Sequence, residues 1–368
     1  MNVHVAPYGG PGWKEKQRIL EAVASRQGAA QLLYNDVLII VPTSRLRRTY
    51  GRLFLDMAER AHGARAVVPP QIQTLYQFFQ QLYGGLGGSP LIDENSRLIV
   101  FEGIVKELIT GRTGFGSTPD ILAPSLSLSL ADMVEELSAA GVGPAQLASA
   151  IVSSESVDKP QTSLLIDAYR AYERVLADKG LVDPSGMLAV LAERFDPAWL
   201  ARYSTVIIDG IHDATGLQAR VLAKIAACGT CTFIVDAPST GHIRSAGERH
   251  PLRLTKEFLA LVGVTAGDAP SAASPDDLFL ADALFSERPF AEAAQQAPSS
   301  FSRSIGLVSA VNTREEVSFI AGEVKRSIRS GTAADSILVA FPSLDEYGTL
   351  VEELFIDFGI PYNRALGR

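Results

Sequence analysis

Short, almost uninterrupted apolar runs alternate with segments of helical periodicity along much of this 368-residue chain. Strands buried on both faces of a parallel sheet have this appearance, because neither side of such a strand meets water. The segments between the runs, such as residues 15–26 and 44–61, carry apolar residues at helical spacing. The alternation therefore predicts an α/β fold built on a parallel sheet. The expected strands are residues 3–6, 37–41, 206–209, 232–236, 305–309 and 337–341.

The middle of the chain has a different pattern, because helical stretches dominate residues 82–200. The run from Ser125 to Leu130 alternates as a strand would, but apolar residues continue it at helical spacing through Leu137. A helix is therefore the better interpretation there, and the block is expected to be an all-helical insertion into the first α/β domain.

These patterns predict four regions. Residues 265–304 are rich in Ala, Ser, Pro and Asp and are expected to be a connector with a short helix near 275–285. The strand–helix pattern after it is short beside the ~100–150 residues of a typical domain, so we expect a truncated second domain. The regions are a first α/β domain (1–81 plus 201–264), the helical insertion (82–200), the connector (265–304) and the start of a second α/β domain (305–368).

Composition excludes several classes of protein. Acidic residues number 41 and basic residues 33, and the resulting net charge of −8 argues against histone-like attraction to nucleic acid while leaving room for a local basic stripe. Two cysteines rule out a disulfide scaffold and suit a reducing compartment. No run approaches the ~18 apolar residues of a membrane span, and no signal segment opens the chain. A cytoplasmic protein outside the membrane is expected.

A glycine-rich segment joins the first predicted strand to the first predicted helix and contains Gly10, Gly12 and Lys14. A phosphate-binding P-loop needs inward-facing backbone N–H groups, a lysine for the phosphates and a Ser or Thr hydroxyl for Mg²⁺. Here Trp13 precedes Lys14 and Glu15 follows it, so the Gly-Lys-Ser/Thr sequence is missing. Taken alone, the segment favours a plain structural turn, and a degenerate nucleotide site is the alternative.

The predicted strand 206–209 ends in Asp209, which is followed by Gly210. In nucleotide-driven motors an Asp in this place holds Mg²⁺, and a neighbouring Glu positions the attacking water. Gly210 removes that Glu, while Asp213 or Thr215 can cap the next helix. Asp209 therefore completes the degenerate nucleotide site, and we assign no catalytic residue.

A basic stripe opens the helix expected after residues 37–41. Arg45, Arg48 and Arg52 fall at i, i+3 and i+7 and share one helical face. A solvated face with ion pairs and a phosphate-contacting face both explain this spacing. Thr and Ser hydroxyls before the stripe can donate to phosphates without reading sequence, which strengthens the phosphate-contacting interpretation without deciding between the two. The candidate phosphate-contacting residues are Thr43, Ser44, Arg45, Arg48 and Thr74.

Cys228 and Cys231 form a CxxC pair, which supplies two of the four ligands that a structural zinc needs. No second pair completes the set, and the five histidines are scattered without metal spacing. No metal site is expected in these residues.

The order of these segments resembles that of UvrD/Rep-like superfamily 1 helicases. Residues 209–215 resemble the helicase motif Asp-Glu-x-x-Asp-Ala/Thr-Thr, with Gly210 in place of the Glu. Residues 233–239 look like the coupling motif Val-Gly-Asp-x-x-Gln-Ser without its Gln. Further segments match the first DNA-contacting motif (42–46), a Thr-Phe-His-like strand-end motif (71–78) and the opening of the second motor domain (312–317, 337–341 and 358–362). The resemblance implies that the candidate phosphate-contacting residues, Thr43, Ser44, Arg45, Arg48 and Thr74, are DNA-binding residues.

Helicase order combined with a broken P-loop and Gly210 is similar to the AddB/RexB family, the B subunits of bacterial helicase–nuclease repair complexes. Residues 181–186, 208–210 and 215–218 are strings typical of that family. The resemblance implies a RecA-like helicase domain with a helical insertion, the start of a second RecA-like domain, and an AddA-like helicase–nuclease partner. In the family a longer C-terminal part follows, with a PD-(D/E)XK nuclease and often an iron–sulfur cluster, so Mg²⁺ and the cluster are expected there.

Three losses favour a non-catalytic helicase-like module that binds single-stranded DNA and a motor subunit in DNA double-strand-break repair and recombination. They are the Gly-Lys-Ser/Thr sequence, the Glu after Asp209 and the Gln after Asp236. Two alternatives stay open: an active superfamily 1 helicase with a divergent P-loop, and a scaffold that contacts only protein. The full-length protein is expected to be an ATP-dependent exonuclease subunit, with no cofactor bound by residues 1–368.

Overall fold

The structure is a computed structural model. It divides into two compact units, Met1–Ala297 and Pro298–Arg368. The residues it describes are 2–6, 10–26, 33–63, 67–110, 119–152, 159–228, 230–248, 250–264 and 306–363, with a few positions between 276 and 297. The predicted connector and its helix therefore lie almost wholly outside the described residues.

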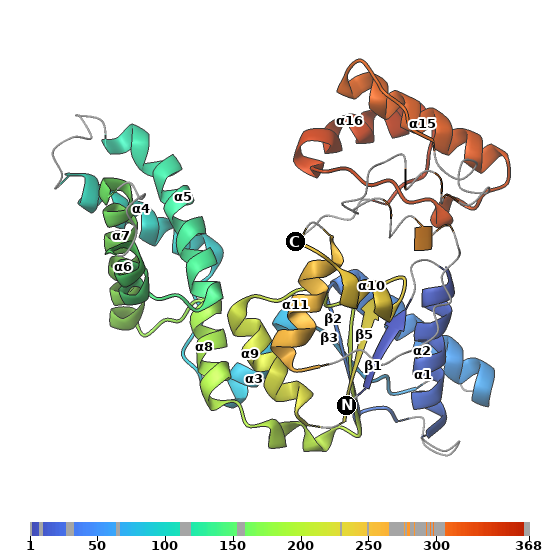
Figure 1. Ribbon diagram of the computed structural model, residues 1–368, viewed down its shortest axis with the longest axis horizontal. Helices are drawn as coiled ribbons and strands as arrows, with labels where there is room; N and C mark the ends of the chain where they lie inside the picture. The colour runs from blue at the N-terminus through green and yellow to red at the C-terminus, as the bar shows by residue number, and fades with distance from the viewer. Residues whose placement is uncertain are drawn as a thin grey trace. The chain divides into compact units, whose positions relative to one another are not determined.

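Five parallel strands form one sheet in the first unit, in the order β1-β5-β4-β2-β3 (Figure 1). The sheet joins strands from both sides of the helical segment, as the α/β prediction requires, and the α/β class is confirmed. β3 is missing from the predicted strands because its sequence, QIQT, contains no apolar run and it lies at the edge of the sheet. The strands are β1 (Asn2–Ala6), β2 (Val37–Val41), β3 (Gln71–Thr74), β4 (Thr205–Asp209) and β5 (Cys231–Asp236).

Helices cover both faces of this sheet, which explains why β2 and β4 are buried at every position. Alternate side chains of a strand point to opposite faces, so Ile39 packs toward one helical layer and Leu38 toward the other. α1 (Gly10–Arg26) and α2 (Ser44–His62) form the first layer. The second layer contains α3 (Leu75–Gly85), α8 (Pro184–Arg194), α9 (Gly216–Ala226) and α11 (Leu252–Val262), with η1 (Pro197–Arg202) and α10 (Thr240–Ser245) beside it.

A helical block with its own hydrophobic core lies between β3 and β4 in the sequence. The helix expected at 125–130 is present, within α5. Phe101 is fully buried in this core and its ring stacks on that of Tyr172, with centroids 4.6 Å apart. α8 falls inside the predicted insertion but packs on the core of the sheet instead. The block contains α4 (Glu94–Thr110), α5 (Pro119–Ala140), α6 (Pro144–Val152) and α7 (Lys159–Lys179).

The second unit contains α15 (Thr313–Arg329), η2 (Ala334–Ser336) and α16 (Leu344–Asp357). The strands predicted at 305–309 and 337–341 are wrong, because described residues 306–310 and 337–341 form no strand. A strand exists only through pairing, and no described residue pairs with these segments. The apolar side chains of residues 337–339 still alternate: Ile337 and Val339 pack on the helices, whereas Leu338 is 86% exposed.

Candidate functional site

The carboxyl edge of the sheet is where ligands bind in open α/β folds, because helix N-termini and polar strand ends meet there. β4 ends in Asp209 and its neighbour β5 ends in Asp236. On the other side of β4, β2 leads to Thr43 and β3 ends in Thr74, with Val41 opposite Thr74 in the register. The topology therefore gathers polar residues from four strand ends that are distant in sequence.

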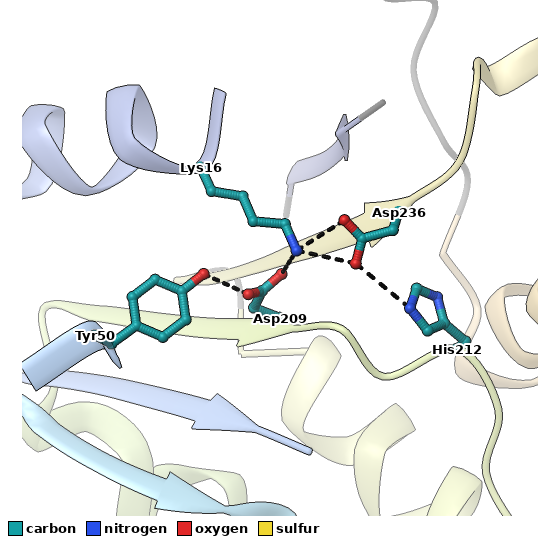
Figure 2. Close-up of polar contacts among 5 residues, drawn as sticks. All are labelled: Lys16, Tyr50, Asp209, His212 and Asp236. Carbon is teal, nitrogen blue, oxygen red and sulfur yellow. Dashed lines mark hydrogen bonds and ion pairs between the residues drawn. The ribbon is translucent and has the colours of Figure 1, made fainter. Parts of the chain in front are cut away.

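A lysine joins the two strand-end carboxylates (Figure 2). Lys16 Nζ lies 2.9 Å from Asp209 Oδ1, 2.8 Å from Asp236 Oδ1 and 2.9 Å from Asp236 Oδ2. The Tyr50 hydroxyl donates a hydrogen bond to Asp209 Oδ2, and His212 Nε2 lies 3.5 Å from Asp236 Oδ2. We call these five residues the Lys16 cluster.

The two α-helices of one layer position this cluster. Lys16 comes from the second turn of α1, and Tyr50 from α2, where its ring lies 6.0 Å from that of Trp13. Asp209 and Tyr50 are both fully buried, and Lys16 is buried as well. A charged pair removed from water in this way persists only when each charge is compensated at close range.

The charges of the Lys16 cluster and their burial shift the pKa values of its members. Burial opposes the ammonium of Lys16, but Asp209 and Asp236 outweigh it and raise the Lys16 pKa above its ordinary value. Burial also opposes the carboxylate of Asp236, yet its hydrogen bond with His212 and the Lys16 charge lower the Asp236 pKa. Burial dominates at Asp209 and raises its pKa, and burial together with the Asp209 charge raises the pKa of Tyr50.

The predicted lysine of the degenerate site, Lys14, is exposed, and Lys16 is the lysine beside Asp209. The sequence contained a signal for Lys16: Gly10 and Lys16 have the spacing of G-x-x-x-x-G-K, with Glu15 in place of the second Gly and Gln17 in place of Ser/Thr. Residues 10–16 are helical. Only the first four N–H groups of a helix lack an internal partner, so later amides in this segment are committed to α1.

Gly210, at the position of the missing Glu, has a left-handed backbone with φ of +73°. Its N–H donates to the carbonyl of Ile234 on β5, 3.2 Å away. A Cβ added here would lie 3.4 Å from the ring of Pro42. The turn after β4 therefore favours glycine for conformational reasons.

Gly210→Ala is expected to lower the free energy of unfolding by about 1–2 kcal/mol, because side chains with a Cβ are strained in the left-handed region. Urea unfolding followed by circular dichroism measures the change. Gly51→Ala is the matched control, since Gly51 lies inside α2 and a Cβ there meets no atom within 4 Å. The control should be neutral or stabilising by up to about 1 kcal/mol. Equal stability of Gly210→Ala and the wild type would contradict the strain argument.

The predicted DNA-binding residues follow two adjacent strands that the topology brings together: Thr43 and the first turns of α2 come after β2, and Thr74 ends β3. Thr43 caps α2 by accepting a hydrogen bond from Leu46 N, and Thr74 caps α3 by accepting one from Gln77 N. A capping hydroxyl uses its oxygen as acceptor and keeps its hydrogen for donation. The exposed members of the set are Thr43, Ser44, Arg45 and Arg48.

Two residues at this edge lie outside the predicted DNA-binding set, although Arg47 belongs to the basic stripe. Arg47 Nη1 donates to Gln77 Oε1 at 3.2 Å and so links α2 to α3. Tyr76, in the first turn of α3, is 47% exposed. An exposed aromatic ring beside Thr74 is the kind of surface on which an unpaired base stacks. The feature of the sequence that could have identified it is a Tyr two residues after the strand-end Thr.

The CxxC cysteines lie just after α9 and at the start of β5. Cys228 and Cys231 are free thiols, and burial raises the pKa of both, that of Cys231 to about 12. Within the described part of the chain, no three His, Cys, Asp or Glu side chains are grouped as metal ligands. Over the same residues, no helix is long and apolar enough to cross a membrane.

Sequence comparison relates this chain to a named group of proteins, although no protein-family model matches it. The B subunit of an ATP-dependent helicase/deoxyribonuclease from Symbiobacterium thermophilum is 27% identical over 305 residues, 76% of this chain. The B subunits of the same name from Moorella thermoacetica and Staphylococcus carnosus are 30% and 22% identical over 65% and 64% of the chain. The chain is therefore similar to AddB-type B subunits, the family that its motif order resembles.

These relatives are much longer than this chain. The chain spans only 25%, 22% and 21% of the three AddB relatives. The parallel sheet with helices on both faces and the separate helical block agree with the RecA-like fold that the family resemblance implies.

Proposed function

We propose that this chain is a non-catalytic, helicase-like module of an AddB-type protein, which binds single-stranded DNA and a motor subunit during DNA double-strand-break repair and recombination. The relatives are named as helicase/deoxyribonuclease subunits, which supports the setting. The observation that carries the non-catalytic role is the contact of Lys16 with both strand-end carboxylates, Asp209 and Asp236.

Two features of α1, the pairing of Lys16 and the helical backbone around it, oppose nucleotide binding. The ammonium that a P-loop directs at phosphates is paired with carboxylates, and a nucleotide must break those pairs to use it. The amides after the first turn of α1 donate within the helix, so fewer remain to cradle phosphates. Gly210, in addition, supplies no carboxylate to orient water.

We therefore expect no ATP hydrolysis, with or without single-stranded DNA, and no heat of binding when ATP and Mg²⁺ are titrated at micromolar concentrations. A phosphate-release assay and calorimetry measure these outcomes. Lys16→Ala and Lys14→Ala are the informative pair, because one lysine is in the cluster and the other is exposed. DNA-stimulated turnover that disappears in Lys16→Ala would establish the alternative, an active helicase.

DNA binding is proposed for the strand-end face, which consists of Thr43, Ser44, Arg45, Arg48 and Thr74. Exposed arginines beside donor hydroxyls suit phosphate oxygens, and such contacts do not read the base sequence. The net charge of −8 repels nucleic acid elsewhere, so binding should be weak, in the ~10⁻⁴–10⁻⁶ M range of nonspecific affinities.

Changing Arg45 and Arg48 together to Ala is expected to weaken single-stranded DNA binding equally for unrelated sequences. The slope of log affinity against log salt is negative, and its magnitude should decrease by about 1.4, since each phosphate contact contributes about 0.7 for a single strand. Fluorescence anisotropy in a salt titration measures both effects. Arg170→Ala with Arg174→Ala removes the same charge from exposed positions on α7 and should bind as the wild type does.

A double variant with unchanged affinity and slope would refute the strand-end face. Binding lost equally in the α7 control would assign the effect to overall charge. Absence of DNA binding by the wild type, with capture of a motor subunit intact, would favour the alternative of a protein-only scaffold.

The remaining parts of the proposal follow the family. The partner is an AddA-like helicase–nuclease subunit, and co-elution of the two proteins in gel filtration tests it. Nuclease activity, its Mg²⁺ and an iron–sulfur cluster are proposed for the rest of an AddB-type protein, in the cytoplasm, and not for the residues of this chain.

A further inference from the structure

RecA-like motors hold Mg²⁺ between the strand-end Asp, a P-loop hydroxyl and the nucleotide phosphates. The residues of this chain do not fit that ion. Gln17 follows the P-loop-spaced lysine where Ser or Thr is needed, and Lys16 Nζ already lies within 2.9 Å of Asp209 Oδ1 and both oxygens of Asp236. The cation position is taken by a side chain.

We propose that the ammonium of Lys16 replaces a divalent cation between Asp209 and Asp236, and that removing this side chain converts the carboxylate pair into a divalent-cation site. This inference rests on the proposed non-catalytic role of the chain, but it does not depend on DNA binding.

The geometry around Asp209 carries the argument. Asp209 is fully buried, and Tyr50 donates to its Oδ2. Its Oδ1 accepts no hydrogen bond of good geometry from any described residue and meets only the Lys16 charge, 2.9 Å away. An acceptor oxygen with one cation as its single partner is the donor that a metal ion also requires.

The second carboxylate faces the same point. Both oxygens of Asp236 contact Lys16 Nζ, at 2.8 and 2.9 Å, and His212 lies behind Oδ2 (Figure 2). Two carboxylates from adjacent strands can supply two ligands to Mg²⁺ or Mn²⁺, which complete their octahedra with water. A lysine tethered to α1 remains beside these oxygens, whereas a free ion must be bound from solution and lose water.

Lys16→Ala in Mn²⁺ tests the inference. Electron paramagnetic resonance of free Mn²⁺ should show no specific binding by the wild type and about one ion bound by Lys16→Ala. Thermal unfolding of the variant, and not of the wild type, should shift upward with Mn²⁺, because a ligand that binds only the native state stabilises it. Lys14→Ala, an exposed lysine on the same helix, should behave as the wild type.

The double variant Lys16→Ala/Asp209→Asn should bind no Mn²⁺. If Lys16→Ala is unfolded without metal, recovery of its circular dichroism on adding Mn²⁺ supports the proposal, and failure to recover contradicts it. Mn²⁺ binding by the wild type that Asp236→Asn abolishes would also overturn it. Single-stranded DNA affinity measured in EDTA is independent of the Mn²⁺ result, so failure of either proposal can be recognised without the other.

Discussion

Replacing Lys16 by Met is expected to lower the free energy of unfolding of the first unit by about 3–5 kcal/mol, the cost of leaving a buried charge without its partner. Met keeps most of the volume of the lysine stem, so the loss reports the charge. Asp209 has no solvent contact and would retain only the Tyr50 hydroxyl as a partner among the described residues. Urea unfolding monitored by circular dichroism measures the change.

Two controls separate charge from packing. Lys14→Met changes an exposed lysine of the same helix and should stay within about 0.5 kcal/mol of the wild type. Lys16→Met/Asp209→Asn also removes the charge of the fully buried Asp209 and should recover a large part of the loss, because the remaining amide is easier to bury than a carboxylate. A double variant no more stable than Lys16→Met would contradict the electrostatic explanation.

The Lys16 cluster also predicts that stability depends on pH in the alkaline range. The pKa of Lys16 is raised in the folded state, so its contribution is fully present below its ordinary pKa of 10.5 and is lost as pH rises through the folded value. The wild-type advantage over Lys16→Met should therefore shrink above about pH 10.5. Melting temperatures of both proteins, compared between neutral and alkaline pH, provide the measurement.

Phe101→Ala is expected to destabilise the helical block by about 3–5 kcal/mol, since the truncation removes a buried ring and leaves a cavity beside Tyr172. The block has a core separate from that of the sheet. Native-state hydrogen exchange should therefore show faster exchange in α4, α5 and α7 with unchanged protection in β2 and β4. Ile99→Ala, 69% exposed on the same helix, should have little effect. Equal loss of protection in both regions would show that sheet and block unfold as one unit.

Much of the architecture could be predicted from local pattern. Four of the five strands coincide with predicted apolar runs, and β2 and β4, with both faces covered, are buried at every position. Periodicity detects such runs directly. Asp209 was identifiable as a strand end because charge interrupts the run. β3 could not be predicted from an apolar run, because a short polar edge strand contains none. Residues 337–341 show the reverse error: they form an apolar run but have no pairing partner among the described residues.

The sequence did not predict which elements pack against one another. α8 looks like its neighbours in the helical block, yet Met187, Leu188 and Leu191 join the core of the sheet. Amphipathic helices of similar composition can cover either core, and the choice depends on the path of the chain in three dimensions.

Residues adjacent along the chain were enough to predict the α/β class, the helical block, the strand-end Asp209 and the family resemblance. The contact of Lys16, and not Lys14, with Asp209 and Asp236 could be seen only once the elements were packed together. The two lysines are about 200° apart around α1, at about 100° per residue, so one faces the sheet edge and the other faces solvent. Which one does so depends on the rotation of α1 as it packs on the sheet, a property of the contacts between elements that no local pattern contains.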